Sequence, residues 1–489
     1  MTDLTAGPLR HPADGRTRVA IVGAGLAGLG LGIRLRRAGA SDFLLLERAD
    51  EVGGVWRDNV YPGVACDIPS HLYSYSFRPK DDWSRVFAPG PEILDYLRKA
   101  AAEEGVLAHV RLGTALESAT WDDAARCWRL VTSRGPLTAD VLVLAAGRLT
   151  QPRLPDVPGL AGFSGRAFHS ARWEPEPLTG LRVGVVGTGA SAVQLLPHVA
   201  QESRHTVVFQ RTPAWVLPRG DRAYAAGEPR PSRTELAAEA ERLFEARLAG
   251  SDAARVLRAR SLGHLADQVD DPALREALTP TYDIGCKRAV FSDDYFPALQ
   301  RPDVTLEASA LARVEGSRAT AASGAAYDLD VLVFATGFET ARQPYAELVV
   351  GRRGETLAEH WRDGMTSHAS TVVSGFPNLF IVDGPNATLG HHSAIEIIEA
   401  QLDYILGALD HLARDARPLE VSAAAEAAYT DLVDRLAART VWLRGGCESW
   451  YLDPRSGRIV LLWPERASEF RRLNATFEPA AFGRAADER

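Results

Sequence analysis

Several features are scarce in this sequence, and each absence excludes a class of protein. Only 4 of the 489 residues are cysteine, and Cys66, Cys127, Cys286 and Cys447 form no Cys-x-x-Cys pair. This spacing fits neither a zinc site nor a dithiol centre, so we expect reduced, scattered thiols of the kind typical of the cytoplasm. No run reaches the ~18 uninterrupted apolar residues of a membrane span. Residues 1–18 lack the apolar core of a signal peptide.

An excess of positive charge is also missing. The net charge is -8, with acidic and basic residues interspersed. Because a nucleic-acid partner would require a basic patch, we expect none, and nothing in the sequence points to a membrane partner. The hydrophobic fraction of 46% and the charged fraction of 24% are ordinary for a soluble globular protein. The length predicts about three domains.

One element occurs twice along the chain. Residues 17–38 and residues 181–200 both start with a short β-branched run, turn on glycines and continue with helical apolar spacing. Two apolar runs, residues 139–147 and 329–337, are typical of buried parallel strands that each close one nucleotide-binding unit. The pattern predicts an α/β fold with two Rossmann-like dinucleotide-binding domains.

The rest of the chain completes this organisation. A stretch rich in Pro and Gly after Gly147 reads as a linker. A stretch rich in Ala, Glu, Arg and Leu has no strand signal and is expected to be a helical insertion. We therefore assign residues 1–150 and 338–489 to an FAD-binding domain, 151–228 and 280–337 to an NADP-binding domain, and 229–279 to the insertion.

The first glycine turn is Gly23-x-Gly25-x-x-Gly28. Glycines allow the backbone to turn tightly after a strand and to approach a pyrophosphate at a helix N-terminus. Glu47 ends the next apolar run, where an acid accepts hydrogen bonds from ribose hydroxyls. A glycine-rich turn without a ligand is the alternative, but strand, helix and acid together favour a bound dinucleotide, which we take to be FAD.

The second turn is Gly187-x-Gly189-x-x-Ala192. Glu47 and Arg211 each lie 24 residues after the first glycine of their turn, so one unit has an acid where the other has a base. A carboxylate repels a 2′-phosphate, whereas arginine binds one, and the second unit is predicted to prefer NADPH. The alternative is that Arg211 is a solvated surface residue.

Two nucleotide units in one chain indicate electron transfer from a nicotinamide to a flavin. A disulfide reductase would need a closely spaced cysteine pair, which the sequence lacks. Dioxygen is the obvious alternative acceptor.

The predicted linker carries a longer signature. It reads Phe163-x-Gly165-x-x-x-His169-x-x-x-Trp173. This run resembles the fingerprint of type I Baeyer–Villiger monooxygenases, whereas related flavin-containing monooxygenases usually lack the tryptophan. The family commonly continues with Pro or Asp, and Glu174 is a small departure.

Two further stretches resemble the same family. The first is Gly53-Gly54-x-Trp56-x-x-x-x-Tyr61-Pro62-Gly63-x-x-x-Asp67, and the second is Gly285-Cys286-Lys287-Arg288 followed by Ser292-Asp293-Asp294-Tyr295. The resemblance extends from about residue 17 to the C-terminus. It implies that NADPH reduces FAD, that dioxygen forms a peroxyflavin, and that a ketone becomes an ester or lactone, with sulfur oxidation as a further activity.

The resemblance also implies roles for single residues. Arg288 would stabilise the peroxide anion, Asp67 would pair with Arg288, and the role of His169 would be conformational. The cofactor contacts would be Gly54, Trp56, Tyr61 and Asp67 around FAD, and Arg211, Thr212 and Lys287 around the 2′-phosphate of NADPH.

Other interpretations stay open. Trp56 and Tyr61 can be core aromatics, Asp67 a helix cap and the Lys287–Arg288 pair a surface feature. The alternatives for function are a related enzyme that oxidises nitrogen or sulfur, a flavoprotein that passes electrons to a partner protein, and a non-enzymatic dinucleotide sensor. The pair His391–His392 has no carboxylate at ligand spacing, so we expect no metal. We expect a cytoplasmic monomer or weak homo-oligomer whose partners are a ketone and dioxygen.

Overall fold

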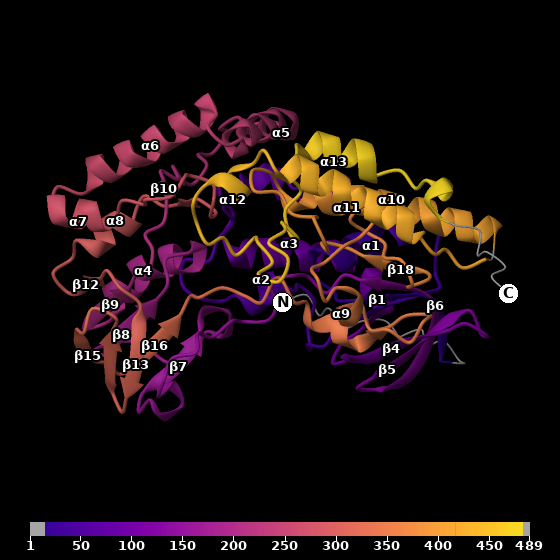
Figure 1. The fold of residues 1–489 in the computed structure, drawn as a ribbon, viewed down its shortest axis with the longest axis horizontal. Coiled ribbons are helices and arrows are strands. Elements are labelled where there is room, and N and C mark those ends of the chain that lie inside the picture. The colour runs from indigo at the N-terminus through magenta and orange to yellow at the C-terminus, as the bar shows by residue number, and fades with distance from the viewer. Residues whose placement is uncertain (1–14, 416, 483–489) are drawn as a thin grey trace.

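A computed structural model describes residues 15–415 and 417–482. Two separate β-sheets lie side by side, with helices over them (Figure 1). Over those described ranges, no helix is both long and apolar enough to cross a bilayer.

The first sheet has eight strands in the order β17-β4-β5-β6-β1-β2-β3, with β18 paired to β6. Its strands are β1 (Arg16–Val22), β2 (Phe43–Leu46), β3 (Val110–Arg111), β4 (Leu116–Asp122), β5 (Cys127–Thr132), β6 (Gly135–Leu144), β17 (Val349–Val350) and β18 (Leu379–Ile381). β1 pairs in parallel with both β2 and β6, and β18 pairs in parallel with the end of β6. Strands from both ends of the chain thus share one sheet.

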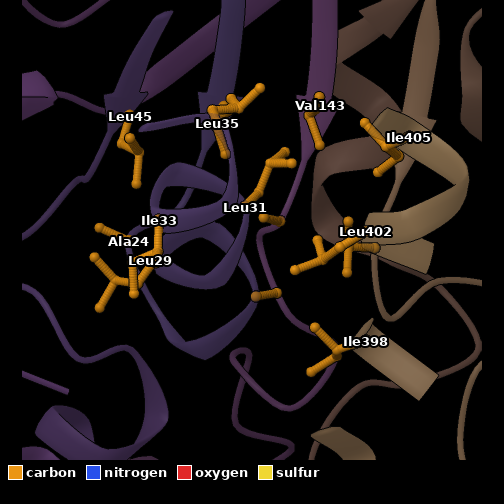
Figure 2. Packing of buried hydrophobic residues seen from close by; sticks show 14 of the residues in the cluster. Ala24, Leu29, Leu31, Ile33, Leu35, Leu45, Val143, Ile398, Leu402 and Ile405 are labelled. Carbon is orange, nitrogen blue, oxygen red and sulfur yellow. The ribbon is translucent and has the colours of Figure 1, made fainter. Parts of the chain in front are cut away.

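The helices α1 (Leu26–Arg37) and α10 (Ala394–Arg414) cover one face of this sheet. Figure 2 shows Leu31 of α1 beside Leu402 of α10 and Val143 of β6. β2 is apolar throughout because both of its faces are buried. On the other face, Trp121 and Trp128 of the β4–β5 hairpin pack in a second apolar cluster.

The second sheet is fully parallel, in the order β12-β9-β8-β16-β7. Its strands are β7 (Arg166–His169), β8 (Arg182–Val186), β9 (His205–Phe209), β12 (Val304–Glu307) and β16 (Val331–Phe334). Helix α4 (Ala190–Glu202) follows β8. The two runs expected to be closing strands are β6 and β16, and each pairs in parallel with the strand that leads into the glycine turn of its unit.

Helices fill the stretch expected to be an insertion: α5 (Arg233–Arg242), η5 (Leu243–Arg247), α6 (Asp252–Gln268) and α7 (Pro272–Ala277). The short parallel pair β10 (Val216–Leu217) and β11 (Val290–Phe291) flanks it. The sequence after α10 forms α11 (Ala423–Ala437), α12 (Val441–Arg444) and α13 (Ala467–Asn474). In Figure 1, α12 lies near the middle of the molecule, between the insertion helices and the helices of the first unit.

The α-helices not yet named are α2 (Val55–Asp58), α3 (Gly90–Glu103), α8 (Tyr295–Leu299) and α9 (Leu357–His360). A small antiparallel sheet is formed by β13 (Leu311–Glu315), β14 (Arg318–Ala321) and β15 (Ala326–Asp328).

Candidate functional site

The first glycine turn joins β1 to α1. Gly23 has a φ of +104°, and a side chain at Gly28 would lie 2.0 Å from the carbonyl oxygen of Gly23. The helix therefore packs closely against the strand only because position 28 has no Cβ atom. The second motif folds onto this turn, since a Cβ at Gly54 would lie 2.9 Å from Cα of Gly25.

Glu47 lies where the sequence predicts an acid. Its Oε2 accepts a hydrogen bond of 2.9 Å from the Ala24 amide in the turn, and Oε1 accepts one of 3.0 Å from Ala49. Arg57 forms an ion pair with the same carboxylate at 3.1 Å. A carboxylate has about four acceptor positions, so capacity remains for ribose hydroxyls. The glycine backbone and this carboxylate fit the pyrophosphate and ribose of FAD.

The second turn joins β8 to α4. Gly187 has a φ of +118°, and a Cβ at Gly189 would meet no atom within 4 Å. The backbone in front of Gly189 is thus accessible to a pyrophosphate. Ala192 lies in the first turn of α4 and is buried. The hydroxyl of Thr188 donates a hydrogen bond of 2.9 Å to the carbonyl of Thr212, which ties the turn to the loop that carries Arg211.

Two cations lie near each other at this end of the second sheet. Burial lowers the pKa of Lys287, and the neighbouring charge of Arg211 lowers it further, while Glu448 acts in the opposite direction. The ammonium group lies 5.3 Å from the ring centroid of Tyr282. Arg211 is exposed. Two like charges in proximity fit the 2′-phosphate of NADPH.

Arg288 and Asp67 meet across the two units. Nε and Nη2 of Arg288 donate to Oδ2 of Asp67 at 2.9 and 2.7 Å. The side chains are 29% and 24% exposed, so the pair is shielded but not sealed. The charge of Asp67 raises the pKa of Arg288, which therefore stays cationic. Arg288 and Asp67 are thus in direct contact, while the roles implied for them by the resemblance stay predictions.

Sequence reasoning missed three neighbours of this pair. Tyr451 is buried, and burial raises the pKa of its phenol, while Arg288, Arg247 and Arg148 lower it. Arg148 forms an ion pair with Asp383. Arg148 lies just beyond the carboxyl end of β6, a position where ligands bind in open α/β sheets, and that rule could have identified it. Arg247 and Tyr451 carry no comparable sequence signal.

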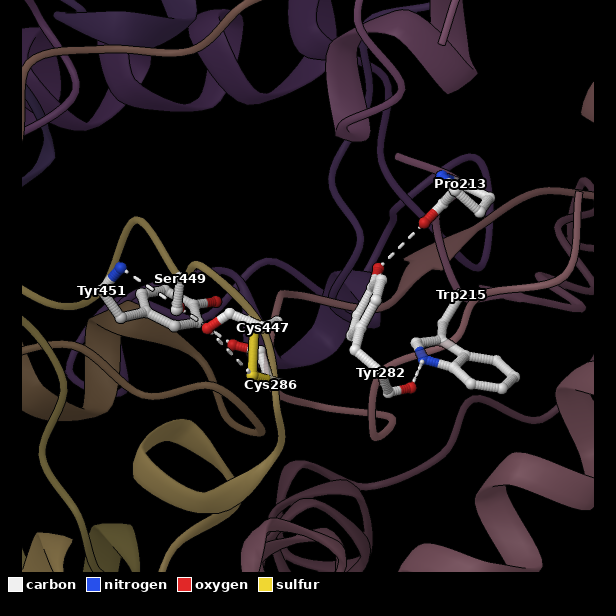
Figure 3. The surroundings of a disulfide bond; sticks show 7 residues. All are labelled: Pro213, Trp215, Tyr282, Cys286, Cys447, Ser449 and Tyr451. Carbon is white, nitrogen blue, oxygen red and sulfur yellow. Dashed lines mark hydrogen bonds between the residues drawn. A yellow bond between two sulfur atoms is a disulfide. The ribbon is translucent and has the colours of Figure 1, made fainter. Parts of the chain in front are cut away.

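The expectation of four reduced, scattered cysteines is wrong for two of them. Cys286 and Cys447 form a disulfide with a Cα–Cα distance of 6.2 Å (Figure 3). Ser449 donates a hydrogen bond of 2.9 Å to the carbonyl of Cys286. The two cysteines are 161 residues apart, so only the fold brings them together. The disulfide attaches the segment after α12 to the residues that immediately precede Lys287 and Arg288.

Cys66 and Cys127 are free and buried.

The aromatic residues of the second motif lie at different places. Trp56 donates from its indole nitrogen to the hydroxyl of Tyr73 at 3.3 Å. Tyr61 packs in the apolar cluster of the second unit, and its hydroxyl donates a hydrogen bond of 3.0 Å to Gln194 of α4. Tyr61 thus joins the two units. Contact of either aromatic ring with FAD stays a prediction.

His169 ends β7 in the linker. It is buried, and its Nδ1 accepts a hydrogen bond of 3.1 Å from the Ala171 amide. Its ring makes an edge contact with Phe338, which follows β16. Trp173 packs against Phe168. His169 therefore holds the linker against the chain that leaves the second sheet, and its role in the reaction stays a prediction.

A cavity of about 210 Å³ lies where the linker meets the first unit. Arg48, Asp58 and Asn59 line it from the first unit, and Thr150, Arg172 and Phe338 line it from the linker side. Arg48 directly follows Glu47. The cavity is thus lined by the residue that follows Glu47 in the chain.

His391 and His392 precede α10, with ring centroids 6.4 Å apart. Across residues 15–415 and 417–482, no group of three or more His, Cys, Asp or Glu side chains is placed to hold a metal ion.

The chain resembles known proteins over most of its length. Residues 16–355 match the family described as flavin-binding monooxygenase-like. A Baeyer–Villiger monooxygenase of Streptomyces coelicolor is 44% identical over 473 residues, which cover 93% of this chain and 90% of that protein. A Baeyer–Villiger monooxygenase of Pseudomonas aeruginosa is 39% identical over 495 residues, which cover 98% and 93%.

Solved structures of monooxygenases have a similar fold. A closed cyclohexanone monooxygenase superposes with a TM-score of 0.85 at 27% identity, covering 94% of this chain and 97% of the other. An oxidised steroid monooxygenase bound to NADP gives a TM-score of 0.82 at 30% identity, with 94% and 96% covered. The OTEMO complex with FAD and NADP gives 0.84 at 27%, with 93% and 96% covered.

Proposed function

This chain belongs to the flavin-binding monooxygenase-like family, and we propose that its Asp67–Arg288 pair is the place at which a ketone is oxidised. The chain is an FAD- and NADPH-dependent monooxygenase of the Baeyer–Villiger type. Ketone, dioxygen, NADPH and a proton give an ester or lactone, water and NADP⁺. The observation that carries the residue assignment is the meeting of Arg288 and Asp67 beside the cations of the second unit.

FAD, when bound, supplies hydride acceptance and the activation of dioxygen. With FAD bound, Arg288 would supply a fixed positive charge in a shielded site, and such a charge stabilises negative charge that develops on oxygen. Asp67 holds two of the five donors of Arg288, which sets the orientation of the guanidinium group.

Arg211 and Lys287 bind the 2′-phosphate of NADPH, with Thr212 beside them. Their proximity supports this role, as does the hydrogen bond that fixes Thr212 to the glycine turn. Lys287 and Arg288 are adjacent in the chain, so one short segment carries both a residue that binds the coenzyme and the charge proposed for catalysis.

His169 is a positioning residue. It holds the linker between the two sheets through Ala171 and Phe338. With FAD and NADPH held on separate units, the linker that His169 holds would let the two units shift relative to each other.

The partners we propose are a ketone and dioxygen, and the location is the cytoplasm, where NADPH is available. Cys286 is fully buried and Cys447 is half-buried, which limits the access of reductants of that compartment to the disulfide. We propose a monomer or weak homo-oligomer. Light scattering across a concentration series tests this, and a stable higher oligomer at the lowest concentration would refute it.

One experiment tests the proposed reaction. The holoenzyme is screened for NADPH consumption with linear, cyclic, aryl and steroid ketones, and the products are identified by mass. Esters or lactones that contain one oxygen atom from labelled dioxygen are expected. Oxidation of amines and sulfides alone, with every ketone returned unchanged, would replace this assignment with that of a nitrogen- or sulfur-oxidising relative.

A further inference from the structure

Arg247 is a buried cation that the reaction described above does not use. It ends η5 in the helical insertion and is 9% exposed. Its Nη2 donates a hydrogen bond of 2.9 Å to the carbonyl of Gly390, while Nη1 is buried without a hydrogen-bond partner. It forms no ion pair with any residue in the ranges 15–415 and 417–482. Buried donors are nearly always satisfied, so an orphaned one requires an explanation.

Arg247 lies between two segments that lead to the site. A Cβ at Gly285 would be 3.1 Å from Nη1, and a Cβ at Gly390 would be 3.5 Å from Nε. Gly285 precedes Arg288 by three residues, and Gly390 precedes His391. The guanidinium group therefore lies against the backbone of the segment that leads to Arg288 on one side and against the loop before α10 on the other.

Three arginines act electrostatically on the buried Tyr451, and only one lacks a counter-charge within the described part of the chain. Arg148 pairs with Asp383 and Arg288 pairs with Asp67, but Arg247 has no such partner. Burial lowers the pKa of Arg247 to about 10, so the side chain is still protonated at neutral pH. A buried charge without a partner is unfavourable unless an anion binds to it.

His391 offers a second unsatisfied group at the same place. It is 4% exposed, and neither ring nitrogen has a hydrogen-bond partner. Its ring centroid lies 5.4 Å from that of Phe244 in η5. Burial, followed by the charge of Arg247, holds the pKa of His391 well below its ordinary value. The ring is therefore neutral and carries one N–H donor.

We propose that Arg247 and His391 bind a carboxylate carried by the ketone, so that keto acids are the preferred substrate class. This proposal rests on the proposed function and specifies the class of ketone. A carboxylate has two oxygens, which satisfy the free edge of a guanidinium and a neighbouring imidazole N–H together. The anion would also be the counter-charge of Arg247, for which the described part of the chain provides none. Arg288 and Arg148 are already paired, with Asp67 and Asp383.

The competing explanation is structural: Arg247 only clamps the carbonyl of Gly390. A structural clamp would serve acidic and neutral ketones equally. The anion site predicts a difference between a keto acid and its methyl ester, which have nearly the same shape but differ in charge.

The test measures binding by calorimetry to the holoenzyme that holds FAD and NADP⁺. The probes are levulinate, its longer homologues in which more methylene groups separate carbonyl and carboxylate, and the methyl ester of each. We expect at least one acid to bind more tightly than its ester. In Arg247→Met, the dissociation constant of that acid should rise roughly 10- to 100-fold, and that of the ester should stay within about twofold.

Arg233→Met is the matched control. Arg233 belongs to the same insertion and donates a hydrogen bond of 2.7 Å to the Ser74 carbonyl, but it has Glu396 as a charged neighbour at 3.8 Å. The control should leave the preference for the acid unchanged. Arg247→Lys keeps the charge and should retain part of the preference.

Three results would overturn the proposal. The first is wild-type protein that binds no acid more tightly than its ester, a result that needs no variant to fold. The second is an equal loss of acid and ester binding in Arg247→Met. The third is a selective loss of NADP⁺ binding in that variant, which would assign Arg247 to the coenzyme. Because binding is measured without turnover, an acid that binds selectively yet gives no ester would sink the proposed reaction and leave the anion site standing.

Discussion

Arg288 uses two nitrogens, Nε and Nη2, to hold a single oxygen of Asp67, a residue 221 positions earlier in the chain. Asp67 comes from the unit that contains β1, and Arg288 follows the helical insertion. The pair therefore forms only when the two units are together. The position of the positive charge of Arg288 therefore depends on how the two units are arranged.

Replacing Arg288 separates the two halves of the reaction. Arg288→Ala should still permit reduction of FAD by NADPH, because that step needs no cation at the oxygen site. Ester formation should fall by roughly 100-fold or more, as when other preorganised electrostatic groups are removed. Anaerobic stopped-flow absorbance and product mass measure the two steps. Arg182→Ala, at an ion pair with Asp330 away from the site, is the control. Normal ester yield from Arg288→Ala would remove this residue from the mechanism.

Arg211 should determine the choice of coenzyme. Arg211→Ala is expected to raise KM for NADPH roughly tenfold and to leave KM for NADH nearly unchanged, because only NADPH carries the 2′-phosphate. Initial rates with both coenzymes measure this. Arg204→Ala provides the control, since Arg204 is an exposed arginine just before β9, at the opposite end of the same strand. A parallel change with both coenzymes would contradict the assignment.

The disulfide should contribute to stability. Cys447→Ser opens a loop of 161 residues, and removal of a native disulfide typically costs about 2–5 kcal/mol. We expect a lower Tm in the variant, and a similar decrease when the wild type is fully reduced. Cys127→Ser, which alters a free buried cysteine, is the control. Identical melting of wild type and Cys447→Ser would show that the bond contributes nothing.

The pair His360–Glu426 should make stability depend on pH. Burial lowers the pKa of His360, but the hydrogen bond of 2.9 Å and the charge of Glu426 outweigh it and raise the pKa above 6.5. Burial raises the pKa of Glu426, yet its contacts with His360 leave it below 4.5. The pair thus contributes its full stabilisation of the fold between pH 4.5 and pH 6.5.

The stabilisation is lost as pH rises through the pKa of folded His360, and also as pH falls through that of folded Glu426. The difference in unfolding free energy between wild type and His360→Gln should be about 1–3 kcal/mol near pH 6 and smaller near pH 9. Denaturant titrations at both pH values measure it, with Glu426→Gln and the double variant completing a cycle. A free-energy difference between wild type and His360→Gln that increases toward pH 9 would contradict this prediction.

Local chemistry explains which parts of the site could be predicted from the sequence. Gly23 and Gly187 adopt left-handed backbone conformations within a few residues of a strand, and such requirements are visible in a short window. The equal spacing that ends in Glu47 and Arg211 reflects two units with the same local geometry.

Contacts between distant segments explain what could not be predicted. Cys286 and Cys447 are joined only because the segment after α12 lies against the loop before Arg288. Arg247 touches Gly390 across 143 positions and shows no pattern in the sequence around it. Tyr61 reads as a residue of the FAD motif, yet its ring packs with the other unit. Residue type indicates a role in these cases only after the fold has supplied the neighbours.

The pairing of β18 with β6 has a consequence for biosynthesis. β6 ends at Leu144, and its partner begins only at Leu379, after the whole second unit has been made. At a synthesis rate of about 5–20 residues per second, tens of seconds pass between the synthesis of β6 and that of its partner β18. The second unit, whose sheet is built from one continuous stretch, can fold in that interval. The nascent chain is therefore expected to acquire its coenzyme-binding unit before it can complete the unit that holds the flavin.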